Sequence, residues 1–210
     1  MIGIVGRKVG MTQLLTSTGV VVPVTIIEAG PCYVTQVKTP EKDGYVAVQL
    51  GFQETRQKRL TKGQLGHLRR NNLPALRVLR EFRVKSEGEY KVGEKILADL
   101  FVVGEQVDVM GISKGRGFQG GVKRHGFHGG PRTHGQSDRL RAPGASSSGT
   151  TPGRVYKGKR MAGRLGGGHV TVQNLRVVEA DANRHLLLIR GSLPGGVNGV
   201  VLIKKALKKR

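Results

Sequence analysis

Residues 111–170 read GISKGRGFQGGVKRHGFHGGPRTHGQSDRLRAPGASSSGTTPGRVYKGKRMAGRLGGGHV. This segment holds 17 of the 33 glycines of the chain, and twelve Lys and Arg residues against the single acid Asp138. Its apolar residues follow neither a helical nor a strand period, so it lacks the apolar surface that would offset its ordering entropy. The segment is either disordered or ordered by a partner. We interpret it as a functional extension, because a long structureless loop inside a compact domain is improbable.

Short stretches rich in Val, Ile and Leu lie on both sides of this extension, as is typical of strands. Residues 45–52 alternate, with Val46, Val48, Leu50 and Phe52 on one face. Many short strands with Gly, Asp and Asn turns favour a barrel or a sandwich. The simplest architecture is one mainly β barrel with the extension inserted between two of its strands. The expected strands are 2–5, 20–27, 33–39, 45–52, 78–84, 106–113, 170–179, 186–190 and 200–203.

The charge of the chain is large and unevenly distributed. The 210 residues carry 36 Lys and Arg against 14 Asp and Glu, a formal net charge of +22. Self-repulsion of this size favours a polyanionic partner, with nucleic acid ahead of an anionic membrane surface. Basic residues gather in three segments, eight in 55–80, twelve in 111–170 and five in 204–210, whereas the other 117 residues carry 11 basic and 13 acidic residues.

This distribution predicts three parts. A β-barrel core comprises residues 1–110 and 171–203, and it carries a basic loop at 55–80, within which a short basic helix fits 61–71. The second part is the basic extension 111–170. The third part is a basic C-terminal tail, 204–210.

The basic segments indicate RNA binding. A solvated charged face is the plain alternative for 55–80 alone, but three such segments together favour a phosphate-rich partner, which Arg and Gly suit. Only nine residues are aromatic and none is Trp, which favours recognition of backbone and shape over base stacking. The expected RNA-binding residues are Arg56, Lys58, Arg59, Lys62, Arg69, Arg70, Lys114, Arg116, Lys123, Arg124, His125, His128, Arg132, His134, Arg139, Arg141, Arg154, Lys157, Lys159, Arg160, Arg164, Lys204, Lys205, Lys208, Lys209 and Arg210.

Two patterns in the extension match nucleotide-binding motifs only superficially. Gly115, Gly117 and Gly120 have the spacing G-x-G-x-x-G, but the glycines that follow exclude the long helix that a dinucleotide site needs. Residues 114–118 are similar to the RNP1 motif, but Arg116 stands where an aromatic residue is required. We expect no cofactor.

Metal binding and catalysis also lack support. His125, His128 and His134 lie among cations that repel a divalent metal ion, without a cysteine or a pair of carboxylates nearby. Asp138 cannot form a carboxylate pair within the extension, and the serines at 146–148 lack the strained turn of a hydrolase nucleophile. We therefore expect neither a metal site nor an enzyme.

The rest of the sequence indicates the cellular compartment of the protein. Cys32 alone cannot form an intrachain disulfide or a Cys-based zinc site, which is typical of a reducing compartment. No signal peptide is visible at 1–11, and no apolar run approaches the roughly 18 residues of a membrane span. We expect a cytoplasmic protein that contacts no membrane and forms no homo-oligomer.

Six motifs follow one another along the chain. They are MIGIVGRKVGMT at 1–12, PVTIIE at 23–28, VTQVK at 34–38, SKGRGF at 113–118, THG at 133–135 and TPGRVYKGKRMAG at 151–163. Together they resemble the bacterial members of the large-subunit ribosomal protein L3 family. The resemblance implies a six-stranded barrel of the translation-factor type near the subunit surface. It also implies a long extension that runs through ribosomal RNA towards the peptidyl transferase centre.

The same resemblance implies a structural constituent that binds large-subunit ribosomal RNA near its 3′ end, nucleates subunit assembly and has neighbouring large-subunit proteins as partners. The tip of the extension would position nucleotides beside the catalytic RNA without supplying a chemical group. Many family members carry a methylated glutamine in this tip, but here Ser and Thr stand instead, so the methylation is expected to be absent. The tip residues are Pro143, Gly144, Ala145, Ser146, Ser147, Ser148, Gly149, Thr150, Thr151, Pro152 and Gly153. The alternative is a free-standing basic RNA chaperone or nucleoid-like protein, which would use the same charge.

Overall fold

The chain divides into two units in the computed structural model, which describes residues 3–84 and 90–208. Unit 1 comprises Met1–Ser113 and His169–Arg210, and unit 2 comprises Lys114–Gly168. Unit 2 is inserted between β7 (Gln106–Ile112) and β10 (His169–Asp181), two neighbouring strands of unit 1. Gly111 and Val170 pair with each other in these strands, so the sequence-based limits of the extension lie within the barrel.

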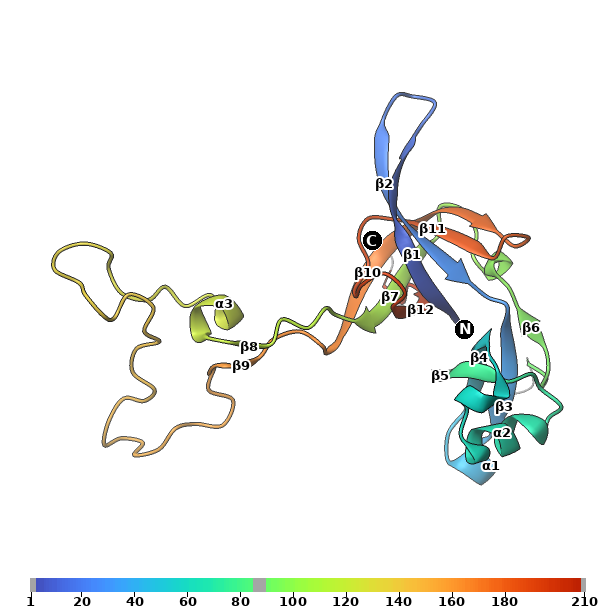
Figure 1. The fold of residues 1–210 in the computed structure, drawn as a ribbon, viewed down its shortest axis with the longest axis horizontal. Helices are drawn as coiled ribbons and strands as arrows, with labels where there is room; N and C mark the ends of the chain where they lie inside the picture. The colour runs from blue at the N-terminus through green and yellow to red at the C-terminus, as the bar shows by residue number, and fades with distance from the viewer. Residues whose placement is uncertain (1–2, 85–89, 209–210) are drawn as a thin grey trace. The chain divides into compact units, whose positions relative to one another are not determined.

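Six strands of unit 1 form a closed antiparallel barrel, which confirms the expected fold class (Figure 1). Its order is β1-β12-β7-β10-β11-β2. Besides β7 and β10, the strands are β1 (Gly3–Leu15), β2 (Val21–Ala29), β11 (Leu186–Arg190) and β12 (Val200–Lys205). Buried Val, Ile and Leu side chains from these strands fill the barrel.

Strand β1 is longer than expected and continues beyond the barrel with β2. Its pairing with β12 ends at Arg7, whereas its pairing with β2 continues to Leu15, so the outer part is a two-stranded hairpin (Figure 1). Residues 6–10 are rich in glycine and basic residues, so the sequence shows no strand pattern there. This part of the chain is a strand because it pairs with β2. No charged residue lies between Lys8 and Glu28. Ile2, where the strand was expected to begin, lies outside the described residues.

A second sheet follows β2 in the chain and shares the core of the barrel. Its order is β5 (Leu76–Arg83), β4 (Ala47–Glu54), β3 (Cys32–Lys38) and β6 (Lys95–Ile96). The short helix α1 (Pro40–Asp43) follows β3, whereas the single-turn helix η2 (Ala98–Leu100) follows β6 and contacts β10. Val48, Leu50 and Phe52 are buried, as the alternation predicted. A Cβ on Gly3 of β1 would lie 2.5 Å from the Phe82 ring of β5, so glycine permits the two sheets to pack closely.

The expected basic loop at 55–80 is largely regular structure. It contains the single-turn helix η1 (Gln57–Arg59), the helix α2 (Lys62–Arg69) and the start of β5. The Thr61 hydroxyl accepts from the backbone N–H of Gln64, and the Gln64 side chain accepts from the backbone N–H of Thr61. This capping box fixes the start of α2. Helix α2 confirms the short basic helix expected at 61–71, and η1 and β5 make the segment more regular than a loop.

Cys32 is fully buried at the start of β3. Its thiol donates a hydrogen bond to the backbone oxygen of Val5 over 3.3 Å. Burial disfavours the thiolate and raises the pKa of Cys32 to about 12.

Folding stability is therefore expected to fall as the pH rises above 9.0, the ordinary pKa of this thiol. Above that pH the unfolded chain releases the thiol proton, whereas the folded chain keeps it until the pH approaches 12. By pH 10 the loss from this group is about 1.4 kcal/mol. Urea unfolding at pH 8 and pH 10 measures it, with Cys32→Ala as the matched control. The same pH dependence in both proteins would contradict the prediction.

Candidate nucleic-acid interface

Unit 2, residues 114–168, is called the arm below, and it begins as a two-stranded stem. Strand β8 (Phe118–Gln119) pairs antiparallel with β9 (Gly163–Arg164). The backbone N–H of Leu165 donates to the oxygen of Gly117 over 2.9 Å, which extends the pairing. Main-chain hydrogen bonds therefore order this part of a segment whose side chains show no strand period.

The arm has no core of its own. Among its residues, all of which the structure describes, none is buried, and the most enclosed are only half-buried. Close backbone contact takes the place of side-chain packing at Gly166, which has a φ of +74°. A Cβ there would overlap the carbonyl oxygen of Lys114, so glycine is required at this crossing. The order of the arm therefore depends on backbone contacts within it and on contacts with a surrounding partner.

Two of the expected RNA-binding side chains form hydrogen bonds to the backbone of the arm itself. They belong to the one-turn helix α3 (Gly121–His125). The Arg124 guanidinium donates to the backbone oxygen of Met161 over 2.7 Å, and a ring nitrogen of His125 lies 2.9 Å from the same oxygen. Both side chains are half-buried and hold α3 against the returning chain. Their partner lies more than thirty residues away, so the sequence offered no signal for this role.

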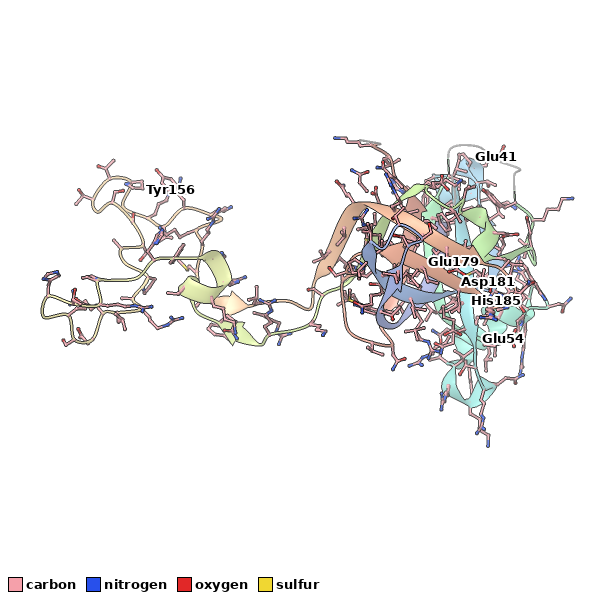
Figure 2. The ribbon with its side chains drawn as sticks, turned by 90° about the horizontal axis from the view of Figure 1, so that it is seen from above. Glu41, Glu54, Tyr156, Glu179, Asp181 and His185 are labelled. Carbon is pink, nitrogen blue, oxygen red and sulfur yellow. The ribbon has the colours of Figure 1, made fainter. Side chains whose placement is uncertain are left out.

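The other eleven Lys and Arg side chains of the arm are exposed. None of the arm residues that the structure describes forms an ion pair, and the one acid of the arm, Asp138, is exposed as well. The acids labelled in Figure 2 (Glu41, Glu54, Glu179 and Asp181) all belong to unit 1. The arm therefore carries an uncompensated positive charge. The exposed cations are Lys114, Arg116, Lys123, Arg132, Arg139, Arg141, Arg154, Lys157, Lys159, Arg160 and Arg164.

The basic residues around α2 are held on a folded surface of unit 1. Leu68 is buried and anchors the helix, and a ring nitrogen of His67 lies 2.8 Å from the Gln49 side-chain oxygen on β4. The Asn71 amide donates to the backbone oxygen of Thr35 over 2.8 Å. This anchoring leaves the expected RNA-binding residues of the segment exposed to solvent: Arg56, Lys58, Arg59, Lys62, Arg69 and Arg70.

Part of the expected C-terminal tail is strand. Lys204 and Lys205 belong to β12, and the Lys205 ammonium lies 3.1 Å from a Glu105 carboxylate oxygen. Lys205 is therefore already paired within unit 1. The Lys204 ammonium lies 5.3 Å from the centre of the Phe82 ring, although the residue is exposed. Lys208 is exposed, whereas Lys209 and Arg210 lie outside the described residues.

The expected tip, 143–153, is an exposed turn with small side chains. Only Pro152 is half-buried. The Ser147 hydroxyl donates to the backbone oxygen of Arg154 over 3.2 Å, and the N–H of Gly153 donates to the oxygen of Gly149 over 3.3 Å. These bonds close the turn and leave its outer surface to small polar groups.

The structure does not assemble a nucleotide or metal site from the other motifs. The G-x-G-x-x-G pattern that ends at Gly120 is followed only by the five-residue α3, which ends at Gly126. His128 and His134 are exposed. Over residues 3–84 and 90–208, no group of three His, Cys, Asp or Glu side chains is placed to hold a metal ion. No helix in these ranges is long and apolar enough to cross a membrane.

Aromatic side chains of the arm were missed in the sequence, because the low total obscured their position. Three of the nine aromatic residues lie in the arm. Phe118 is 75% exposed and Tyr156 is 60% exposed. The Arg154 guanidinium lies 5.5 Å from the centre of the Tyr156 ring. Phe127 is half-buried beside α3.

Comparisons with known proteins agree on one family: a family model matches part of the chain, and relatives match nearly all of it. Residues 89–185 match the family model described as ribosomal protein L3. The chain is 59% identical to the large ribosomal subunit protein uL3 of Roseiflexus sp. (strain RS-1), with 98% of each chain covered. It is 58% identical to the uL3 protein of Chloroflexus aggregans, with 98% of each chain covered. It is 54% identical to that of Pelotomaculum thermopropionicum, with 99% of this chain and 98% of the relative covered.

Proposed function

The chain belongs to the ribosomal protein L3 family, and on this basis we propose that it is a structural constituent of the large ribosomal subunit. Its partners are large-subunit ribosomal RNA and neighbouring large-subunit proteins, and it acts in the cytoplasm as part of the ribosome. The family is structural, which agrees with the expectation that the chain is not an enzyme.

The uncompensated charge of the arm supports RNA as the main partner. Eleven exposed cations lie on one 55-residue unit that has no ion pair and no buried residue. Cations that neutralise phosphates release condensed counterions, which supplies much of the affinity of proteins for nucleic acid. The exposed cations of α2 and η1 add a second contact surface on unit 1.

We further propose that the arm is the part that enters folded RNA. A unit with no buried core and with closely spaced backbones fits between RNA helices. Contacts of its cations with RNA phosphates would then order it in place of side-chain packing. Binding near the 3′ end of the RNA, with the tip 143–153 near the peptidyl transferase centre, follows from the family resemblance. Early binding would let the protein nucleate subunit assembly.

Cross-linking tests this path. A photoreactive group placed at Arg141 or at Ser147 in the assembled subunit is expected to react with nucleotides near the peptidyl transferase centre. Cross-links confined to RNA at the subunit surface would contradict the placement of the tip.

Sedimentation separates a ribosomal constituent from the alternative of a free-standing RNA chaperone or nucleoid-like protein. A constituent remains with intact large subunits through a high-magnesium gradient in near-stoichiometric amount. A chaperone uses the same charge but exchanges freely, so it would trail at the top of the gradient. Recovery of the chain mainly in the free fraction would overturn the proposal.

A bulky side chain at the tip is expected to impair peptidyl transfer, or to alter the action of drugs that bind nearby, without unfolding the barrel. Ser148→Trp fills space in an exposed turn of small residues, so it would displace adjacent nucleotides. The free energy of unfolding should stay within about 0.5 kcal/mol, as is usual for surface sites. Puromycin reaction rates of purified ribosomes measure the effect, with Asn183→Trp in the exposed β10–β11 turn as the matched control. Loss of barrel stability in Ser148→Trp alone would show that the turn is structural.

A further inference from the structure

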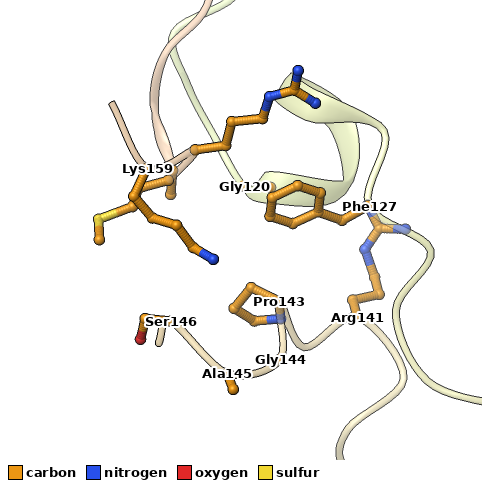
Figure 3. Close-up of a pocket in the computed structure, with 12 residues that line it drawn as sticks. Gly120, Phe127, Arg141, Pro143, Gly144, Ala145, Ser146 and Lys159 are labelled. Atoms are coloured by element: carbon orange, nitrogen blue, oxygen red, sulfur yellow. The ribbon is translucent and has the colours of Figure 1, made fainter. Parts of the chain in front are cut away.

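A hollow of about 580 Å³ lies within the arm, between α3 and the turn that begins at Pro143 (Figure 3). Its size falls in the range of ligand pockets, about 300–1,000 Å³. Figure 3 shows the Lys159 side chain pointing into the hollow, with the Phe127 ring and Pro143 also facing it. Apolar side chains and cations share the lining: Phe127, Pro143, Met161, Arg141, Lys159 and Arg160.

The Phe127 wall is fixed by contacts with neighbouring residues of the arm. A Cβ on Gly121 would lie 2.7 Å from the Phe127 ring, so the ring rests directly on the glycine backbone. The His125 and Phe127 ring centres are 5.7 Å apart, with 33° between their planes. The hydrogen bonds from Arg124 and His125 to the backbone oxygen of Met161 join this wall to the returning chain of the arm. In the folded arm, these contacts give the hollow its shape.

The lining combines an aromatic ring with positive charge, and no acidic side chain takes part in it. Nucleotides match this combination, because a base has a flat face for stacking and its phosphate is an anion. We propose that the hollow binds a single unstacked nucleotide of the RNA, with its base against Phe127 and its phosphate near Lys159 and Arg141. The proposal rests on the proposed function, since it assumes that the arm lies in RNA.

Other ligand classes fit the lining less well. A metal ion or a protonated amine is itself a cation and needs oxygen ligands. The three cations in the lining would repel it. A phosphate alone would not need the apolar walls. The stacking contact also departs from the expectation that the arm recognises only backbone and shape.

Affinity measurements on the full chain with large-subunit ribosomal RNA test the stacking contact. Phe127→Ala and Phe127→Leu are each expected to weaken binding about tenfold at fixed salt, as is typical when a stacked aromatic is removed. Phe127→Tyr keeps the aromatic face and should keep the affinity. Leu140→Ala is the matched control, because Leu140 is 42% exposed in the arm but does not line the hollow. Full affinity in Phe127→Leu would overturn the proposal, since apolar packing alone would then suffice.

Salt dependence separates stacking from phosphate contact. Phe127→Ala should leave the slope of log affinity against log salt unchanged, whereas Lys159→Gln should reduce its magnitude by about one. A reduced slope in Phe127→Ala would show that the whole arm had moved away from the RNA, which contradicts a local contact.

Chemical probing of assembled subunits identifies the nucleotide. One or two bases should become reactive to dimethyl sulfate or carbodiimide in Phe127→Ala subunits and stay protected in Phe127→Tyr subunits. If no base changes, the pocket proposal fails while normal incorporation of the variant still supports the ribosomal role.

Discussion

The affinity of the full chain for large-subunit ribosomal RNA is expected to fall by about 10³ to 10⁵ between 50 and 200 mM monovalent salt. This range corresponds to six to ten phosphate contacts, each of which adds about −0.9 to the slope of log affinity against log salt. The eleven exposed and unpaired cations of the arm are sufficient for that number. Filter binding or fluorescence anisotropy across this salt range gives the slope directly.

Matched charge variants assign this slope to the arm. Arg132→Gln removes an exposed arm cation and should reduce the magnitude of the slope by about one. Lys205→Gln removes the same charge from a residue already paired with Glu105, so the slope should remain unchanged. Equal effects of the two variants would show that net charge matters and position does not. An affinity that is flat from 50 to 200 mM salt would refute the electrostatic mechanism.

Much of the barrel was predictable because its strands carry their own local signal. The range 186–190 agrees with β11 at both ends, and the alternation in 45–52 identified Val48, Leu50 and Phe52 as buried residues of β4. Elements whose order comes from distant partners were not predictable. Outer β1 depends on pairing with β2, and the two-residue β6 is a strand only because β3 lies beside it.

The candidate interface was predictable in charge but not in detail. Local composition located the basic segments, because unpaired cations need no structural context to be counted. Whether a given cation is free to bind RNA depends on long-range contacts. Arg124, which bonds to Met161, and Lys205, which pairs with Glu105, are examples. The hollow beside Phe127 was also hidden, since it forms only when α3 meets residues 159–162. Composition thus predicted the class of partner, and the fold determines which side chains remain exposed and unpaired to bind it.

Proteolysis of the arm in the free full chain is expected to be fast and to slow by about 100-fold when RNA is present at 100 times its Kd. Without RNA, residues 114–168 have no buried side chain, so local opening costs little free energy. Limited trypsin digestion followed by mass spectrometry measures cleavage after exposed arm residues such as Arg139 and Lys157.

The control cleavage site decides what this protection means. Arg184 lies in an exposed turn of unit 1 that is not among the expected RNA-binding residues, so cleavage there should not change with RNA. Because RNA binding supplies the protection, raising the salt from 50 to 200 mM at fixed RNA should restore fast cleavage of the arm. An arm that resists trypsin equally in the free protein would be ordered by its own contacts, and the stem at β8 and β9 would then suffice to fold it. Protection of Arg184 to the same degree would indicate that RNA covers unit 1 as well as the arm.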